Sequence, residues 1–182
     1  DDYVLFSSFT HHPYNTQFVL EVQDNSNWEK VYNVTLNDFT NIAENAVLNG
    51  YTIAWAADVS EKGFNFKEGL AIVPEKDWAD MSPEERKNAF LEPGKEKTIT
   101  PELRQQAFDN FETQDDHGMH IVGLVKDQNG NKYFRVKNSW GTDNPGQGYF
   151  YASEPYFAYK TTCFMVNKKA LPAEVAKKLG IK

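Results

Sequence analysis

The sequence has little cysteine and no long apolar run. Cys163 is the single cysteine, which excludes an internal disulfide framework and any metal site with several cysteine ligands. A transmembrane helix needs about 18 or more consecutive apolar residues, and no such run is present. The sequence therefore predicts neither a disulfide-stapled scaffold nor a membrane span.

A surplus of basic residues is also missing. The chain has 19 Lys and Arg against 26 Asp and Glu, a formal net charge of −7. An acidic surface repels phosphate backbones, so nucleic acid is not an expected partner. Hydrophobic residues make up 40% of the 182 residues and aromatic residues 14%, which is enough for a sizeable core. We therefore expect residues 1–182 to form a single globular domain.

The start of the chain carries neither an initiator methionine nor a charged-then-apolar leader before Asp1. We therefore expect either that a preceding segment is removed or that the chain is a fragment of a longer protein. The composition does not distinguish a cytoplasmic protein from a periplasmic or secreted one whose leader has been removed.

Periodicity and end signals predict mixed secondary structure. Apolar and polar residues alternate over 17–23, which indicates a strand. Thr35 is a good helix N-cap, apolar residues then recur at helical spacing, and Gly50 can end that helix. The run Tyr51–Ala57 is typical of a buried strand, and 63–69 of a loop.

Later segments carry equally clear signals. Further strands are predicted at 122–126, 132–137, 148–152 and 162–166, and further helices start near Ser82, Thr100 and Pro172. Ser82-Pro83 and Thr100-Pro101 each place an N-cap before a proline in the first turn. The sum is an α+β fold, an antiparallel sheet or barrel with inserted helices.

A predicted hairpin brings a histidine to an asparagine. Residues 127–130 are turn-forming, so the chain reverses there. If they form a four-residue loop, Asn138 lies opposite Met119, with His117 two positions along on the same face. A three-residue loop shifts the register by one and places His120 beside Asn138 instead. Spacing alone therefore predicts a His–Asn pair without choosing the histidine.

Such a pair has a chemical use. An asparagine oxygen can accept from one ring N–H and so fix the imidazole tautomer, which leaves the other ring nitrogen facing a nucleophile. The alternative interpretation is two ordinary polar residues that close a hairpin.

The motif around these residues resembles a known family. Asn138-Ser139-Trp140-Gly141, downstream of His117-Gly118-Met119-His120-Ile121-Val122-Gly123, resembles the active-site motifs of papain-superfamily cysteine peptidases. The branch it resembles is that of bleomycin hydrolase and aminopeptidase C, and the segments 50–60, 148–157 and 166–175 are also similar to it. The resemblance implies the β-rich right lobe of a papain-like enzyme, its C-terminal half.

The resemblance implies roles for single residues. The family's catalytic histidine precedes a small residue and an apolar strand, which fits His117 and makes His120 a structural strand histidine. Asn138 matches the orienting asparagine, and Trp140 the indole that shields the His–Asn hydrogen bond from water. Asp116 matches the residue whose backbone carbonyl meets the substrate main chain.

The strand Ala54-Trp55-Ala56 has two interpretations. Its residues line one wall of a substrate pocket, or they form an ordinary core strand.

The nucleophile of the family is absent from this chain. The cysteine signature of papain-like enzymes does not occur, and Cys163 lies downstream of the histidine in a predicted strand, where a small buried hydrophobe is the favoured interpretation. The resemblance implies a cysteine-type, aminopeptidase-like enzyme whose missing N-terminal lobe carries the cysteine. Its substrate would be a peptide, and this chain alone would be inactive. The alternative is a non-catalytic binding or inhibitory module on a papain-like scaffold.

Three further expectations concern ligands, the tail and assembly. No metal site is expected at the neighbouring His11 and His12, which would point to opposite faces of a strand, and the resemblance implies no metal or cofactor. In the family the C-terminus can reach into the cleft, a role that would fall here to Ile181 and Lys182; the alternative is a helix end that frays in solvent. Relatives form rings, so a homo-oligomer is an expectation that this half of the enzyme does not test.

Overall fold

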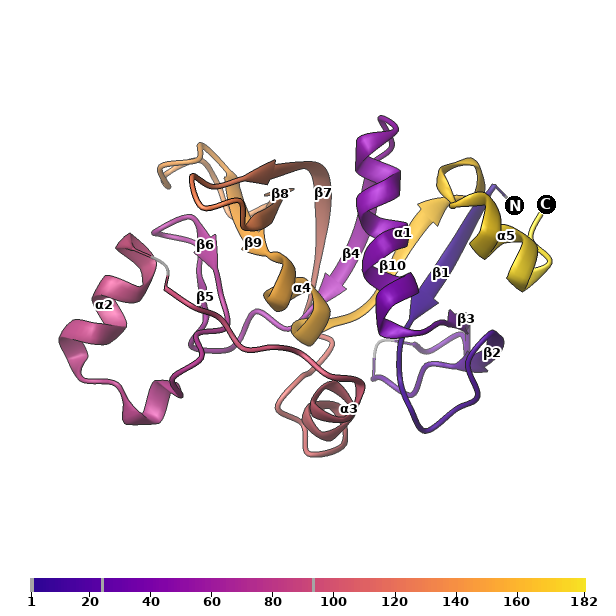
Figure 1. The fold of residues 1–182 in the computed structure, drawn as a ribbon, viewed down its shortest axis with the longest axis horizontal. Coiled ribbons are helices and arrows are strands. Elements are labelled where there is room, and N and C mark those ends of the chain that lie inside the picture. The colour runs from indigo at the N-terminus through magenta and orange to yellow at the C-terminus, as the bar shows by residue number, and fades with distance from the viewer. Residues whose placement is uncertain (1, 24, 93) are drawn as a thin grey trace.

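A long mixed sheet with helices packed on it makes up the molecule (Figure 1). The computed structural model describes residues 2–23, 25–92 and 94–182. Within them the sheet has the strand order β2-β3-β1-β10-β4-β7-β8-β9-β6-β5. The strands are β1 (Tyr3–Ser7), β2 (Thr16–Val19), β3 (Lys30–Asn33), β4 (Ile53–Ala57), β5 (Phe64–Asn65), β6 (Leu70–Ala71), β7 (His117–Lys126), β8 (Lys132–Lys137), β9 (Tyr149–Ser153) and β10 (Thr161–Asn167).

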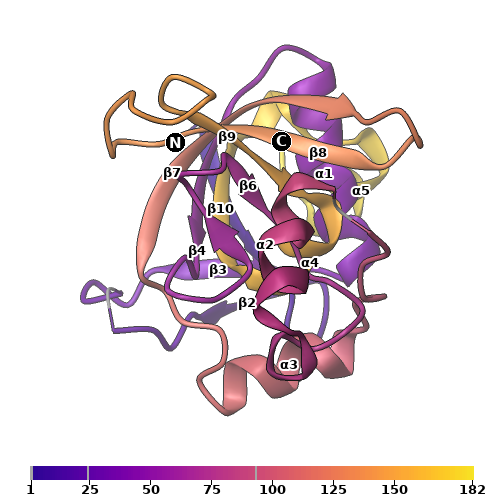
Figure 2. The same ribbon diagram turned by 90° about the vertical axis from the view of Figure 1, so that its left-hand side faces the viewer.

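Five α-helices accompany the described strands. They are α1 (Leu36–Leu48), α2 (Pro83–Leu91), α3 (Pro101–Asp109), α4 (Glu154–Lys160) and α5 (Ala173–Leu179). Figure 2 shows α1, α4 and α5 on one side of β4, β7 and β10. Figure 1 shows α2 at the far end of the sheet, beyond β5 and β6. In the part of the chain that the structure describes, no helix is long and apolar enough to cross a membrane.

End signals in the sequence explain where the helices begin. The Thr35 hydroxyl accepts from the Asp38 amide, and Gly50 follows α1 in a left-handed conformation with φ +80°. Ser82 and Glu85 form a capping box at α2, and the Thr100 hydroxyl accepts from the Leu103 amide at α3. The predicted helix starts are confirmed.

The main core lies between the sheet and the helices α1 and α4. Phe157 of α4 is fully buried, and its ring packs against those of Phe39, Phe134 and Phe164, at centroid distances of 5.4, 4.7 and 5.7 Å. Trp55 of β4 lies 6.0 Å from the same ring. This aromatic cluster fixes α4 against the strands that carry the candidate site.

The sequence prediction is wrong about several strands. Strand β2 ends at Val19 instead of running to 23, and the predicted loop 63–69 contains β5. Strands β1 and β3 and helix α4 were not predicted. The sheet is also not wholly antiparallel, because β1–β3 and β6–β9 pair in parallel. Long connections separate these two pairs in sequence, as parallel pairing requires.

The tail and the two neighbouring histidines also differ from expectation. Ile181 packs against the main core, so this residue does not reach into a cleft in this structure. His11 and His12 lie in a turn with ring centroids 4.4 Å apart, not on opposite faces of a strand. The His11 ring nitrogen Nδ1 lies 3.1 Å from the Gln105 side-chain oxygen.

Candidate active site

His117 and Asn138 meet where β7 begins and β8 ends. The His117 Nε2 and Asn138 Oδ1 atoms are 2.8 Å apart. The Ser139 backbone amide donates to the same Oδ1 atom, also at 2.8 Å. An amide N–H can only donate, so Oδ1 is the carbonyl oxygen and the His117 Nε2 atom carries a hydrogen. The tautomer leaves Nδ1 as the basic nitrogen, and no hydrogen bond to it occurs within the described residues.

The register that joins this pair arises from two compensating features. The hairpin loop runs over 127–131, because Lys126 pairs with Lys132. That extra loop residue would shift Asn138 by one position along β7. A bulge between Ile121 and Gly123 restores the register, and Ile121 pairs with Val136. This register places Asn138 beside Met119 and two positions from His117 on the same face, as the four-residue loop predicted.

The Trp140 ring lies next to that of His117, and its shielding of the His–Asn hydrogen bond stays a prediction. Its ring centroid lies 4.8 Å from that of His117. Phe64 and Phe66 each meet the Trp140 ring nearly edge-on, with centroids 5.6 Å away. Edge-to-face packing of this kind holds a half-exposed indole in place. The two phenylalanines were not recognised in the sequence, because they lie in the segment predicted as a loop.

The connection from 138 to 148 is held as a fixed loop. The Asn138 amide donates to the Gly148 carbonyl at 2.9 Å. The Asn144 side chain accepts from the Gly148 amide and donates to the Tyr149 carbonyl, both at 2.7 Å. Gly148 has φ +92°, a conformation that favours glycine. The loop thus positions the Asn138 side chain from both ends.

One atom of Asn138 is left without a partner. Its Nδ2 group is buried and meets no acceptor in the described part of the chain. A buried unpaired donor costs about 1–3 kcal/mol. Stability alone therefore does not explain an asparagine at this position.

Asp116, just before the histidine, is tied down by its side chain. Its two carboxylate oxygens accept from the backbone amides of Val59 and Ser60, at 2.9 and 3.2 Å. These amides belong to the turn that follows β4. The side chain thus fixes the backbone that enters His117, and the predicted contact of the Asp116 carbonyl with substrate stays a prediction.

The sequence allows two interpretations of residues 54–56, a wall of a substrate pocket or a core strand, and the structure gives a different answer for different residues. Trp55 is buried in the core, and its indole N–H donates to the Thr161 hydroxyl at 2.7 Å. It therefore cannot line an open pocket. Ala54 and Ala56 lie on the other face, exposed and half-buried, and Ala56 pairs with Gly118 next to His117. For these two alanines, a place in the wall of a substrate pocket stays a prediction.

Cys163 and His120 lie outside the His–Asn pair. Burial raises the pKa of the Cys163 thiol to about 12, and the charge of Asp115 adds to the shift. The thiol therefore stays protonated at neutral pH, unlike a catalytic thiolate. Cys163 packs against the smaller apolar cluster around Phe9 and Phe18. His120 is exposed and pairs with Ala54 and Lys137 in the strand ladder.

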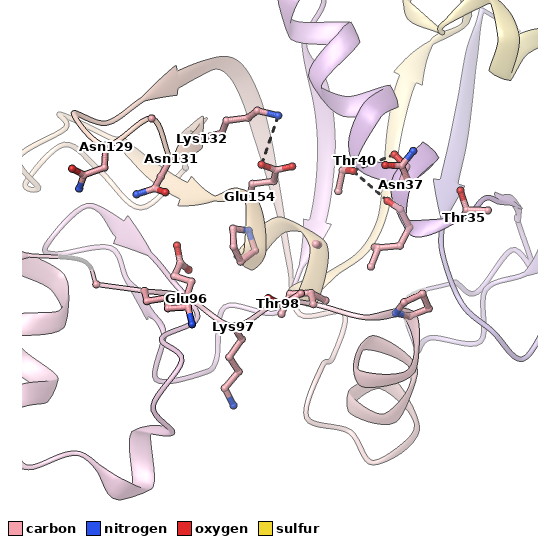
Figure 3. A pocket seen from close by; sticks show the side chains of 18 of the residues that line it. Thr35, Asn37, Thr40, Glu96, Lys97, Thr98, Asn129, Asn131, Lys132 and Glu154 are labelled. Atoms are coloured by element: carbon pink, nitrogen blue, oxygen red, sulfur yellow. Dashed lines mark hydrogen bonds and ion pairs between the residues drawn. The ribbon is translucent and has the colours of Figure 1, made fainter.

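A groove of about 1110 Å³ lies elsewhere, on the side of the helices (Figure 3). Lys132 and Glu154, with 3.7 Å between Nζ and Oε2, face it together with Asn131 and Thr40. None of the His–Asn–Trp residues lines this groove. It is therefore not part of the candidate active site.

Glu61, in the turn after β4, gives a pH-dependent prediction. Burial raises the pKa of its carboxyl from 4.5 to about 7, which the charge of Lys160 only partly offsets. Because the folded state holds the proton more tightly, this stabilisation is complete below about pH 4.5 and is lost as the pH rises through about 7. Glu61→Gln removes the titration. We expect the unfolding free energy of the parent protein, relative to the variant, to fall by up to about 3 kcal/mol over this range.

Denaturant unfolding of the complete gene product at pH 5 and pH 8 measures this difference. Glu84→Gln, on the exposed face of α2, is the matched control and should follow the parent curve at both pH values. Equal pH dependence of the parent and Glu61→Gln would contradict the prediction.

Comparison with known proteins identifies the family. The model of the peptidase C1-like family matches residues 1–181. Aminopeptidase C from Lactococcus lactis subsp. cremoris is 27% identical over 169 residues, which cover 89% of this chain and 35% of that protein. Aminopeptidase W from Lactobacillus delbrueckii subsp. lactis is 37% identical over 59 residues, which cover 32% of this chain and 14% of that protein.

A solved structure supports the same fold. The crystal structure of PepW from Lactobacillus rhamnosis HN001 matches with a TM-score of 0.68 and 22% identity, over 98% of this chain and 38% of that one. The chain thus spans about a third of the length of aminopeptidase C. The match of the family model over nearly the whole length shows that the chain belongs to the peptidase C1-like family, within the papain superfamily of cysteine peptidases and related to its aminopeptidases.

Proposed function

We propose that this chain is the histidine-bearing part of a cysteine aminopeptidase that works through a Cys-His-Asn triad. The observation that carries the proposal is the 2.8 Å contact between His117 Nε2 and Asn138 Oδ1, with Nδ1 left unbonded by the described residues. His117 would act as the acid–base group and Asn138 as its orienting group. The nucleophile would come from a lobe outside this chain, since the Cys163 thiol is held protonated.

The geometry supports a defined series of proton transfers. Asn138 keeps Nε2 protonated, so Nδ1 is the nitrogen that takes the proton of the cysteine thiol. The thiolate attacks the scissile carbonyl carbon, and His117 donates its proton to the leaving amine. A water molecule, deprotonated by the same Nδ1, then attacks the thioester carbon. The acid is released, the thiol regains its proton, and the enzyme returns to its starting state.

The position of Trp140 supports the same proposal. A hydrogen bond between imidazole and amide weakens when water competes for it. The indole 4.8 Å from the His117 ring would limit that access and is itself held by Phe64 and Phe66. The unpaired Nδ2 of Asn138 also supports the proposal, because an asparagine that costs stability at a buried position indicates a functional use.

The names of the relatives support a proposal about the substrate class. Aminopeptidase C and aminopeptidase W are named for the removal of N-terminal residues, and we propose peptides with a free N-terminus as substrates here. The remaining partner would be the lobe that carries the cysteine.

The test uses the complete gene product and aminoacyl fluorogenic substrates, with and without prior treatment with iodoacetamide. We expect hydrolysis under reducing conditions and its loss after alkylation. Hydrolysis that resists alkylation would exclude a cysteine nucleophile. No hydrolysis under reducing conditions would favour the other candidate, a non-catalytic binding module on a papain-like scaffold.

A further inference from the structure

Asp58 is a buried carboxylate at the point where β4 ends, with 3% of its surface exposed. Its Oδ2 atom accepts from the Gln114 amide at 3.0 Å. Its Oδ1 atom accepts from the amide and the hydroxyl of Ser60, at 2.9 and 3.2 Å. Burial raises the pKa of Asp58, and the hydrogen bond from Gln114 is the largest opposing influence. A carboxylate placed here at an electrostatic cost calls for an explanation.

The backbone of Asp58 is fixed as firmly as its side chain. Its amide donates to the Lys160 carbonyl at 3.0 Å, and its carbonyl accepts from the Tyr156 hydroxyl at 2.7 Å. Lys160 and Tyr156 both belong to α4, which is anchored in the main core. Asp58 is therefore attached to a helix that is largely buried in the main core.

His117 occupies the end of a strand ladder. The pairing of β4 with β7 stops at Ala57 and His117, so no further backbone pair supports the chain before the histidine. Strand ends open readily when only their last pair holds them. The Asp58 carboxylate lies one residue beyond Ala57 and accepts from Gln114, three residues before His117. If the pairing of β4 with β7 continued, a backbone carbonyl would accept from an amide in this segment. The Asp58 carboxylate provides that acceptor instead.

The whole approach to His117 is held in this way. Lys160 Nζ donates to the Glu112 carbonyl at 2.6 Å, and the Thr162 hydroxyl donates to the Asp115 carboxylate at 2.9 Å. With the bonds at Gln114 and Asp116, four residues of the segment 112–116 are hydrogen-bonded to the turn after β4, to α4 and to β10. Two of these hydrogen bonds join a buried charge to the backbone of this segment, the one from Lys160 to Glu112 and the one between Asp58 and Gln114, and the second lies nearer to His117.

We propose that Asp58 is a positioning residue for His117, which holds the segment 112–116 so that the imidazole keeps its place against Asn138 and the nucleophile. The inference rests on the proposed function as far as catalysis is concerned. It also makes a structural claim that does not depend on activity, namely that Asp58 restrains the backbone before His117.

Asp58→Asn tests the proposal with little change in size. One side-chain oxygen becomes an NH₂ donor that faces either the Gln114 amide or the Ser60 donors, so one set of hydrogen bonds is lost. Asp38→Asn is the matched control, because Asp38 is also buried and its Oδ2 atom pairs with Lys178 Nζ at 2.8 Å at the start of α1. Both variants lose a bonded carboxylate, and only Asp58 touches the segment before His117.

The main readout is kcat per active site in the complete gene product, with sites counted by a covalent thiol-directed inhibitor. We expect Asp58→Asn to lower kcat by about 10- to 100-fold with little change in KM, because small displacements of a catalytic group cost that much. Asp38→Asn should keep kcat within about twofold. This substitution changes the stability of the fold and so the number of folded molecules, but kcat is measured per active site. Equal kcat values in Asp58→Asn and the parent would overturn the proposal.

Hydrogen exchange separates this inference from the proposed function. We expect peptides covering 112–117 to exchange faster in Asp58→Asn than in Asp38→Asn. If the parent enzyme shows no hydrolysis, the proposed function fails and exchange alone decides the structural claim. Unchanged exchange of 112–117 in Asp58→Asn would then overturn it.

Discussion

Replacing His117 with alanine in the complete gene product is expected to lower kcat/KM for an aminoacyl substrate by about 10²- to 10⁴-fold, the usual contribution of a general acid–base group. The substitution removes the only ring that contacts Asn138 Oδ1 in the described structure. Without it, neither deprotonation of the thiol nor protonation of the leaving amine has a positioned group. The measurement is steady-state hydrolysis under reducing conditions.

His120 supplies the matched control for this prediction. It lies on the same strand, but its side chain is exposed, and it forms none of the site contacts. His120→Ala should keep kcat/KM within about threefold, because exposed strand positions rarely affect folding strongly. A large loss in His120→Ala with little change in His117→Ala would reverse the choice of histidine.

Asn138→Ala should fall between these two. The imidazole would remain, but nothing would fix its tautomer or orientation, and a loss of about 10- to 100-fold is expected. This ordering of the three variants follows from the contacts each side chain makes.

The His–Asn pair was predictable from the sequence only in part. The hairpin signal at 127–130 placed Asn138 opposite Met119, with His117 two positions along on the same face, but the real loop is longer, and the bulge at β7 corrects the register. Gly123 adjoins the bulge, and a glycine inside a strand is a common sign of one, but it does not fix where or whether the register shifts. Spacing could therefore propose the pair, and the family resemblance was needed to choose His117 over His120.

The sequence predicted the helices whose starts carry capping residues and a recognisable first turn. It missed α4, which is short and buried on almost all sides. The helices α1, α2 and α3 begin at capping residues followed by recognisable first turns. Helix α4 has the same signal, Ser153 as N-cap and Pro155 in the first turn, but it is short and buried almost all round. No amphipathic period marks such a helix, because both faces are apolar.

The supports of the site were the least predictable part. Asp58 accepts a hydrogen bond from Gln114, and the Trp140 ring packs against those of Phe64 and Phe66, in each case across a long stretch of sequence. Such contacts depend on the tertiary fold, and local propensity carries no information about them. A polar residue directly after the buried strand β4 was the one available signal for Asp58.

Phe157→Ala is expected to destabilise the fold by about 3–5 kcal/mol, the range for removing a buried aromatic ring. Phe157 is fully buried, and its ring meets Phe134 at 4.7 Å and Phe164 at 5.7 Å. The surrounding rings come from strands and helices that are fixed by many other contacts, so they cannot collapse into the cavity. A domain of this size should lose roughly 6–20 °C in its unfolding midpoint.

Thermal unfolding of the complete gene product, followed by circular dichroism, measures the shift. Phe111→Ala is the control, since that ring is 75% exposed and should change the midpoint by less than about 2 °C. Because α4 carries Lys160, whose carbonyl accepts from the Asp58 amide, loosening this helix also releases the segment before His117. Phe157→Ala should therefore lower kcat per active site even well below its midpoint. If Phe157→Ala has an unchanged kcat per active site at a low temperature where it is fully folded, the predicted effect of α4 on the position of His117 is contradicted.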